Sequence, residues 1–165
     1  MKIVVDTNVL VSGMLSSEGP PGVIVRMIVS GSLQLCFDGR ILAEYEAVLK
    51  RPEFALHTSH VASLLAQIVA GGESVSSLPT TQHLLDPSDA KFVDVALAGQ
   101  VECLATGNLR HYPPACRQGV RVLSPREFLS FFRDHLSGNP DKIKSPSAQY
   151  RTRKPGKSKK YRRTL

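Results

Sequence analysis

Short apolar runs separated by polar segments, glycines and prolines recur over the first 136 residues of the chain. Brief apolar or alternating runs, typical of buried strands in a parallel sheet, span residues 3–5, 33–37, 101–105 and 120–123, and a fifth strand is expected over 73–78. Segments with helical spacing and helix start or stop signals span 9–15, 23–30, 40–51, 59–70, 86–99 and 124–136. This alternation predicts an α/β fold, a three-layer α/β/α arrangement with a mainly parallel sheet.

The positive charge of the chain is concentrated at its end. The 165 residues carry 21 Lys and Arg against 14 Asp and Glu, a net charge of +7, but residues 141–165 hold ten of the basic residues and one acid. The remaining 11 basic and 13 acidic residues give the body a charge of −2. From Gly138 onward there are few apolar residues with which to build a core. We therefore predict a folded domain over 1–137 and a basic, flexible tail over 138–165.

The remaining composition argues against several classes of protein. Cys36, Cys103 and Cys116 are far apart and form no CxxC, which is typical of a reduced intracellular protein without a zinc cluster. The longest apolar stretch, 61–70, is too short to span a membrane, and Asp6 interrupts any secretory signal. The chain has no phosphate-binding GxxxxGK[ST] or GxGxxG loop. We expect a cytoplasmic protein with no membrane partner.

Two acids are expected near the carboxyl edge of the sheet, where parallel α/β folds bind their ligands. Asp6 directly follows the first predicted strand, so we expect it at the carboxyl edge of the sheet, where such folds bind ligands. Alternatively it only caps the next helix. Glu44 shares a helix face with Ile41 and Val48 and is expected to point inward. A buried carboxylate needs a hydrogen-bond partner or a metal, and a partly buried Glu bonded to an amide or an arginine is the alternative.

A third acid begins the helix predicted over 86–99. Asp89 lies on one face with Phe92, Val93 and Ala96, and Asp86 is the expected N-cap. Asp89 can alternatively be the reciprocal member of a capping box.

Two further side chains are secondary candidates. Asp94 lies around the same helix from Asp89, and we expect it to be a solvated or lysine-paired acid, with a ligand role in reserve. Asn108 closes the next strand in Thr106-Gly107-Asn108 and can supply an oxygen ligand or orient a water, or be an ordinary turn residue. If Asp6, Glu44 and Asp89 converge, their hard oxygen ligands suit Mg²⁺ or Mn²⁺.

Four segments resemble, in order, those of the PIN-domain family, and especially bacterial members described as toxins of toxin–antitoxin pairs: IVVDTNVLVSGML, ILAEYEAVLKRPEF, LLDPSDAKFVDVALAGQVECLATGN and VRVLSPREFL. Asp6, Glu44 and Asp89 match three acids of that family. The fourth family acid is replaced by Asn108, and a subgroup similar to this chain follows that asparagine with a histidine and an aromatic residue, here His111 and Tyr112.

The resemblance implies a parallel sheet between helices and a metal-dependent endoribonuclease. Asp6, Glu44 and Asp89 would hold Mg²⁺ or Mn²⁺, with Asn108 as a further site residue, and RNA, a cognate antitoxin and a second copy of the chain would be partners. Two rival functions stay open. One is an RNA- or protein-binding module that has lost turnover through Asn108, and the other is a metal-dependent phosphatase of another α/β family.

Overall fold

Five parallel strands form one sheet at the centre of the protein. The computed structural model describes residues 1–79 and 86–138, so the predicted basic tail lies, from residue 139, outside the described residues. The strand order is β3-β2-β1-β4-β5, and every pair is parallel. The strands are β1 Lys2–Val5, β2 Gln34–Phe37, β3 Glu73–Ser74, β4 Cys103–Ala105 and β5 Val122–Leu123. The predicted α/β class with its parallel sheet is confirmed.

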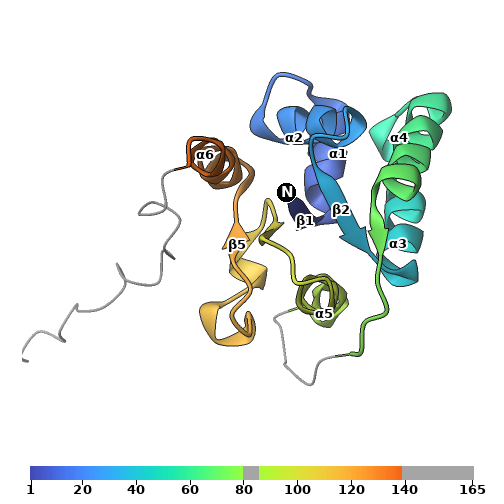
Figure 1. The fold of residues 1–165 in the computed structure, drawn as a ribbon. Coiled ribbons are helices and arrows are strands. Elements are labelled where there is room, and N and C mark those ends of the chain that lie inside the picture. The colour runs from blue at the N-terminus through green and yellow to red at the C-terminus, as the bar shows by residue number, and fades with distance from the viewer. Residues whose placement is uncertain (80–85, 139–165) are drawn as a thin grey trace, which may run out of the picture.

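Helices cover both faces of this sheet. They are α1 Thr7–Leu15, α2 Pro20–Val29, α3 Gly39–Leu49, α4 Thr58–Gly71, α5 Ala90–Ala98 and α6 Pro125–Leu136. Helix α5 packs on β1, β2 and β4, and α1, α2 and α6 lie on the opposite side of the strands (Figure 1). Strand β1 is central, and its Ile3, Val4 and Val5 are fully buried because apolar side chains cover it from both layers. The three-layer prediction is therefore confirmed.

The element ends follow local signals in the sequence. Ser124 and Glu127 form the predicted capping box at the start of α6, with each side chain accepting a hydrogen bond from the other residue's amide. The helix predicted from residue 86 starts instead with a 3₁₀ turn, Pro87–Asp89, and becomes α-helical at Ala90. The strand predicted over 73–78 pairs with β2 only over Glu73–Ser74, so it is a short edge strand.

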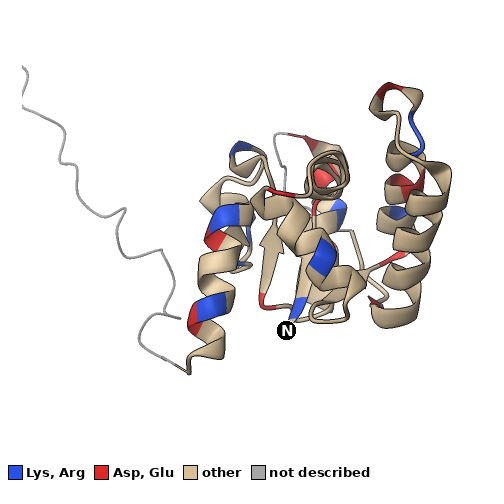
Figure 2. Ribbon diagram, turned by 90° about the horizontal axis from the view of Figure 1, so that it is seen from above, with Lys and Arg blue, Asp and Glu red and all other residues tan. Residues whose placement is uncertain are grey.

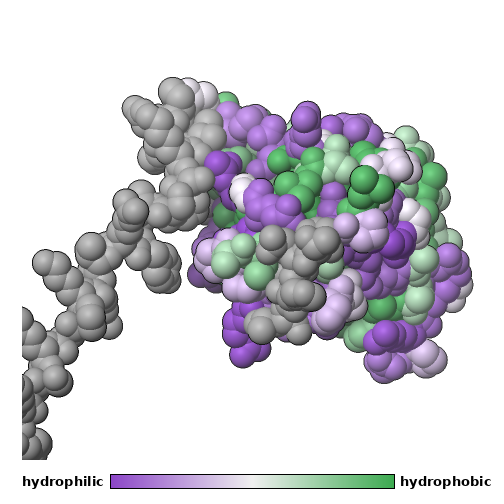
Figure 3. Space-filling view, turned by 90° about the horizontal axis from the view of Figure 1, so that it is seen from below, coloured by the Kyte–Doolittle hydropathy of each residue, from purple (hydrophilic) through white to green (hydrophobic). Residues whose placement is uncertain are grey.

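Charged and apolar residues are mixed over the described surface. Figure 2 shows Lys and Arg interspersed with Asp and Glu along the helices. On the face seen from below, hydrophobic patches alternate with hydrophilic ones (Figure 3). That face therefore does not by itself single out a dimer interface, and the homodimer stays a prediction. Within 1–79 and 86–138, no helix has the length and apolar character to cross a membrane.

A charged cluster joins α3, α5 and the segment after β3. Asp38 caps α3 by accepting hydrogen bonds from the amides of Arg40 (2.9 Å) and Ile41 (3.0 Å). The Arg40 guanidinium pairs with Asp38 at 2.8 Å and with Asp94 at 3.2 Å, and the Ser77 hydroxyl donates to Asp38 at 2.9 Å. The expectation of a solvated or lysine-paired Asp94 is wrong, because its side chain is 1% exposed and it pairs with Arg40. A partner 54 residues away in sequence gives no local signal.

This cluster gives a testable pH dependence. Burial alone would raise the pKa of Asp38, but hydrogen bonds from Ile41, Arg40 and Ser77 hold the pKa below its ordinary value of 3.8. The Asp38 carboxylate therefore stabilises the fold above pH 3.8, and its contribution is lost as the pH falls through the depressed folded-state pKa. Asp38→Asn should lower the free energy of unfolding by about 1 kcal/mol at neutral pH, and less below that window.

Urea denaturation at neutral and acidic pH measures both values. Glu53→Gln is the control, because Glu53 is 63% exposed and its contact with Arg51 is long, at 3.8 Å. An Asp38→Asn cost that stays the same at both pH values would contradict this account.

Candidate metal centre

Asp6 is a buried carboxylate at the carboxyl end of the central strand. Its backbone amide donates to the Ala105 carbonyl of β4 at 2.9 Å, which holds it at the edge of the sheet. Its Oδ2 accepts hydrogen bonds from the Thr106 hydroxyl (2.8 Å) and the Tyr112 hydroxyl (3.2 Å), and its Oδ1 accepts from the Asn8 amide at 3.2 Å. Asp6 therefore caps α1 and also faces the carboxyl edge of the sheet.

The surroundings of Asp6 disfavour its negative charge. Burial raises its pKa above 3.8, and the charge of Glu44 raises it further, although the three hydrogen bonds oppose this rise. The Asp6 charge in turn contributes to raising the pKa of Asp89, for which burial is the larger cause. Asp6 therefore lies within electrostatic range of both Glu44 and Asp89. A cation would offset this repulsion.

Glu44 extends from α3 toward the start of α5. Its Oε1 accepts a hydrogen bond from the Thr7 hydroxyl at 2.5 Å, and its Oε2 pairs with Lys91 Nζ at 2.6 Å. Its side chain is 29% exposed, so it is partly buried at the flank of the fully buried stripe formed by Ile41 and Tyr45. The partners are thus a hydroxyl and a lysine, which the sequence did not indicate.

Asp89, His111 and Asn108 form a hydrogen-bonded row. His111 Nδ1 lies 2.8 Å from Asp89 Oδ2, and its Nε2 lies 2.6 Å from Asn108 Nδ2. With the Asn108 amide in this orientation, its NH₂ donates to Nε2, so Nδ1 carries the proton that His111 donates to Asp89. Asn108 therefore contacts the acids through His111, and its own amide N–H donates to the Thr106 hydroxyl at 3.0 Å.

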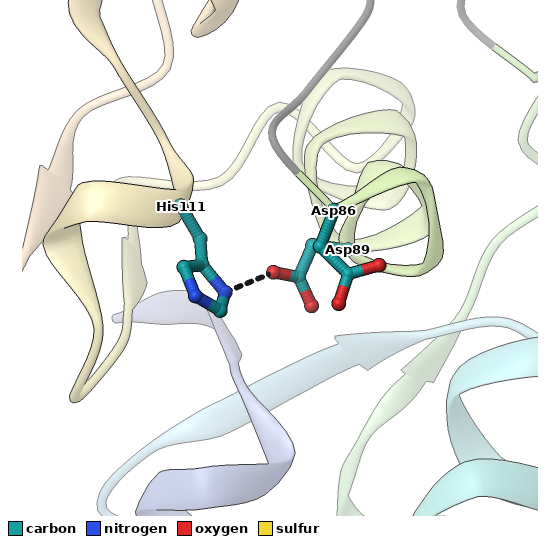
Figure 4. A group of neighbouring side chains, drawn as sticks. All are labelled: Asp86, Asp89 and His111. Atoms are coloured by element: carbon teal, nitrogen blue, oxygen red, sulfur yellow. Dashed lines mark hydrogen bonds and ion pairs between the residues drawn. The ribbon is translucent and has the colours of Figure 1, made fainter.

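One group of described residues brings three ligand atoms close together. Asp86, Asp89 and His111 each offer one atom, and these atoms lie within 4.8 Å of one another (Figure 4). Asp86 also caps the following turn by accepting from the Ser88 amide, and hydrogen bonds from Ser88 are the main cause that lowers its pKa. Among the described residues, neither Asp6 nor Glu44 belongs to this group.

The two carboxylates in this group fit a hard divalent cation, and the buried Asp6 carboxylate lies in electrostatic range of Asp89. His111 donates its Nδ1 proton to Asp89, so it orients a candidate ligand instead of offering a lone pair to the metal. Sequence reasoning treated Asp86 only as a cap and His111 only as part of a family motif. The three-residue spacing of Asp86 and Asp89, which brings both acids to one side of a helical turn, was the signal for their pairing.

Residues 2–110 of the chain match the sequence profile of the PIN domain. The chain belongs to the PIN domain family. The matched region includes Asp6, Glu44, Asp86, Asp89 and Asn108. The chain is also 25% identical, over 148 residues, to the uncharacterized protein MJ1680 of Methanocaldococcus jannaschii. The aligned region covers 83% of this chain and 95% of that protein.

PIN domains are generally metal-dependent nucleases, so the acids of this PIN domain are candidates for its metal ligands. Asp6, Glu44 and Asp89 come to the carboxyl edge of the sheet from the end of β1, from α3 and from the turn before α5. A single ion shared by all three stays a prediction.

Asn108→Asp tests the row that ends on Asp89. An added carboxylate beside His111 brings negative charge toward the acids, and we expect it to tighten Mn²⁺ binding by about tenfold. Titration calorimetry measures the affinity. Asn108→Ala is the matched control, because it removes the hydrogen bond to His111 and adds no charge. Weaker Mn²⁺ binding by Asn108→Asp than by the wild type would show that position 108 is not part of the metal centre.

Proposed function

We propose that this PIN domain is a metal-dependent endoribonuclease that hydrolyses RNA phosphodiester bonds with Mg²⁺ or Mn²⁺. The observation that carries this proposal is the burial of Asp6, a residue that is 5% exposed and whose carboxylate interacts electrostatically with Glu44 and Asp89. Such clustering of carboxylates is costly in an ordinary protein core but is suited to a cation.

The proposed metal centre consists of Asp6, Glu44 and Asp89, with Asp86 as a neighbour whose carboxylate can join them. Asp6 and Asp89 are the proposed ligands of one ion, and Glu44, held by Thr7 and Lys91, lies beside them. A divalent cation held there supplies positive charge to a phosphate and makes a water more acidic. Thr106 and Tyr112 fix the orientation of the Asp6 carboxylate, and the proton on His111 Nδ1 fixes that of Asp89. Glu44 is the candidate to accept a proton from the attacking water.

A cleavage assay on unstructured RNA tests the activity. We expect the wild type to cleave with Mn²⁺ and not with a chelator, and Asp6→Asn or Asp89→Asn to lower the rate by about 100-fold or more, because each removes a ligand charge. Glu46→Gln is the matched control, since Glu46 lies on α3 beside the centre's Glu44 but is 55% exposed. Equal rates for the wild type and Asp6→Asn would refute the proposed centre.

A second function is favoured by one observation. The position after Gly107 is Asn108 instead of an acid, and its amide NH₂ is bound to His111. Fewer negative charges favour a module that binds RNA or a protein without turnover. RNA binding without cleavage would support this function, whereas cleavage of a small phosphate monoester would favour a phosphatase.

The biological setting is also part of the proposal. We infer a cytoplasmic toxin whose partners are RNA and a cognate antitoxin, and which pairs as a homodimer. A neighbouring reading frame for a small DNA-binding protein would support the toxin–antitoxin pair.

The basic tail is expected to strengthen RNA binding. The rest of the chain has a net charge of −2, so most of the attraction for phosphate must come from the ten Lys and Arg after residue 140. Truncation after Ser137 should weaken binding to single-stranded RNA at low salt, and the difference should shrink as salt rises, because counterion release drives the effect. Tyr150 and Tyr161 can add base stacking that salt does not weaken. Fluorescence anisotropy at two salt concentrations measures this, and unchanged binding at both would exclude the tail as an RNA contact.

A further inference from the structure

Lys91 is a nearly buried cation inside the candidate metal centre. It lies at the start of α5, two residues after Asp89, and its side chain is only 12% exposed. Its Nζ pairs with Glu44 Oε2 at 2.6 Å and also donates to the Ser88 carbonyl. The same Nζ lies 4.9 Å from the centre of the Phe92 ring. A lysine normally keeps its ammonium group in water, so three partners and a low exposure mark an ordered charge.

Lys91 completes the set of partners around Glu44. With the Thr7 hydroxyl on Oε1 and Lys91 on Oε2, both oxygens of this carboxylate are engaged by the protein itself. A divalent ion can reach Oε2 only in competition with the ammonium group. The charge of Lys91 also acts on a second acid, since it contributes to lowering the pKa of Asp86.

A lysine–glutamate pair at the C-terminal end of α3 serves for comparison. Lys50 and Glu46 lie 2.5 Å apart, four residues apart in sequence, with side chains 50% and 55% exposed. That pair is a solvated contact on one helix. Lys91 and Glu44 instead join α5 to α3 beside Asp6 and Asp89, so their pairing depends on the tertiary fold of the site.

We propose that Lys91 is a resident cation of the metal centre, which supplies beside Glu44 the positive charge that a second divalent ion would otherwise provide. The centre consequently takes up one Mn²⁺ or Mg²⁺. Lys91 is a positioning residue in this scheme, because it acts through the carboxylate of Glu44. This inference rests on the proposed function in one respect, namely that the acids take up a divalent cation.

Counting Mn²⁺ ions bound to the full chain without RNA tests the proposal. Titration calorimetry and electron paramagnetic resonance should give one ion per chain for the wild type. Lys91→Met should bind a second ion, because Oε2 of Glu44 is released, and Lys91→Arg should stay at one because the positive charge is kept. Adding Glu44→Gln to Lys91→Met should abolish the second ion. Lys50→Met is the matched control and should behave as the wild type.

Three results would overturn the proposal. Lys91→Met could bind one Mn²⁺ with the same affinity as the wild type, the wild type could bind two Mn²⁺, or neither protein could bind Mn²⁺. If Lys91→Met does not fold, Lys91→Gln provides a polar side chain without the positive charge that competes with a divalent ion, and it should also take up the second ion.

Cleavage assays on the same proteins separate this inference from the proposed function. A wild type that binds one ion but cleaves no RNA would refute the nuclease and leave the Lys91 result valid. An active wild type with one ion in Lys91→Met, Lys91→Gln and the control alike would refute only the role of Lys91.

Discussion

The arrangement of the site depends on keeping one buried carboxylate hydrogen-bonded. Asp6 has almost no contact with water, so its oxygens need donors from the protein. Those donors come from Asn8 at the start of α1, Thr106 just after β4 and Tyr112 after the following turn. Meeting this need joins three segments that are up to 106 residues apart in sequence. The same hydrogen bonds orient the Asp6 carboxylate in the candidate metal centre, so the fold and the site share one set of interactions.

The parallel sheet explains why these segments meet. Every strand runs in the same direction, so each β-to-α connection begins at the same edge of the sheet. Placing β1 between β2 and β4 brings Asp6 between the helix that follows β2 and the segments around β4. The acids come from short connections on a rigid frame, which is a common way to hold charged groups that would repel one another in solution.

The sequence predicted what depends on local spacing and missed what depends on distant partners. β-branched runs, helix caps and the capping box of α6 are local features, and so the class of fold was correct. The partial burial of Glu44 also followed from its spacing. The Arg40 partner of Asp94, the Lys91 partner of Glu44 and the His111 partner of Asp89 depend on tertiary packing, which periodicity does not encode. Strand β3 is shorter than predicted because pairing with β2 extends over two residues only.

Helix α3 also determines how readily the centre can open. Tyr45, adjacent to Glu44, is fully buried and donates its hydroxyl to the Val5 carbonyl at the end of β1. Two adjacent side chains of α3 therefore bind different elements: Tyr45 bonds to the central strand and Glu44 pairs with Lys91 of α5. Any rotation of α3 that released Glu44 from Lys91 would also leave a buried hydroxyl without its acceptor. Opening the centre by a movement of α3 therefore carries a cost that a rearrangement of side chains does not carry.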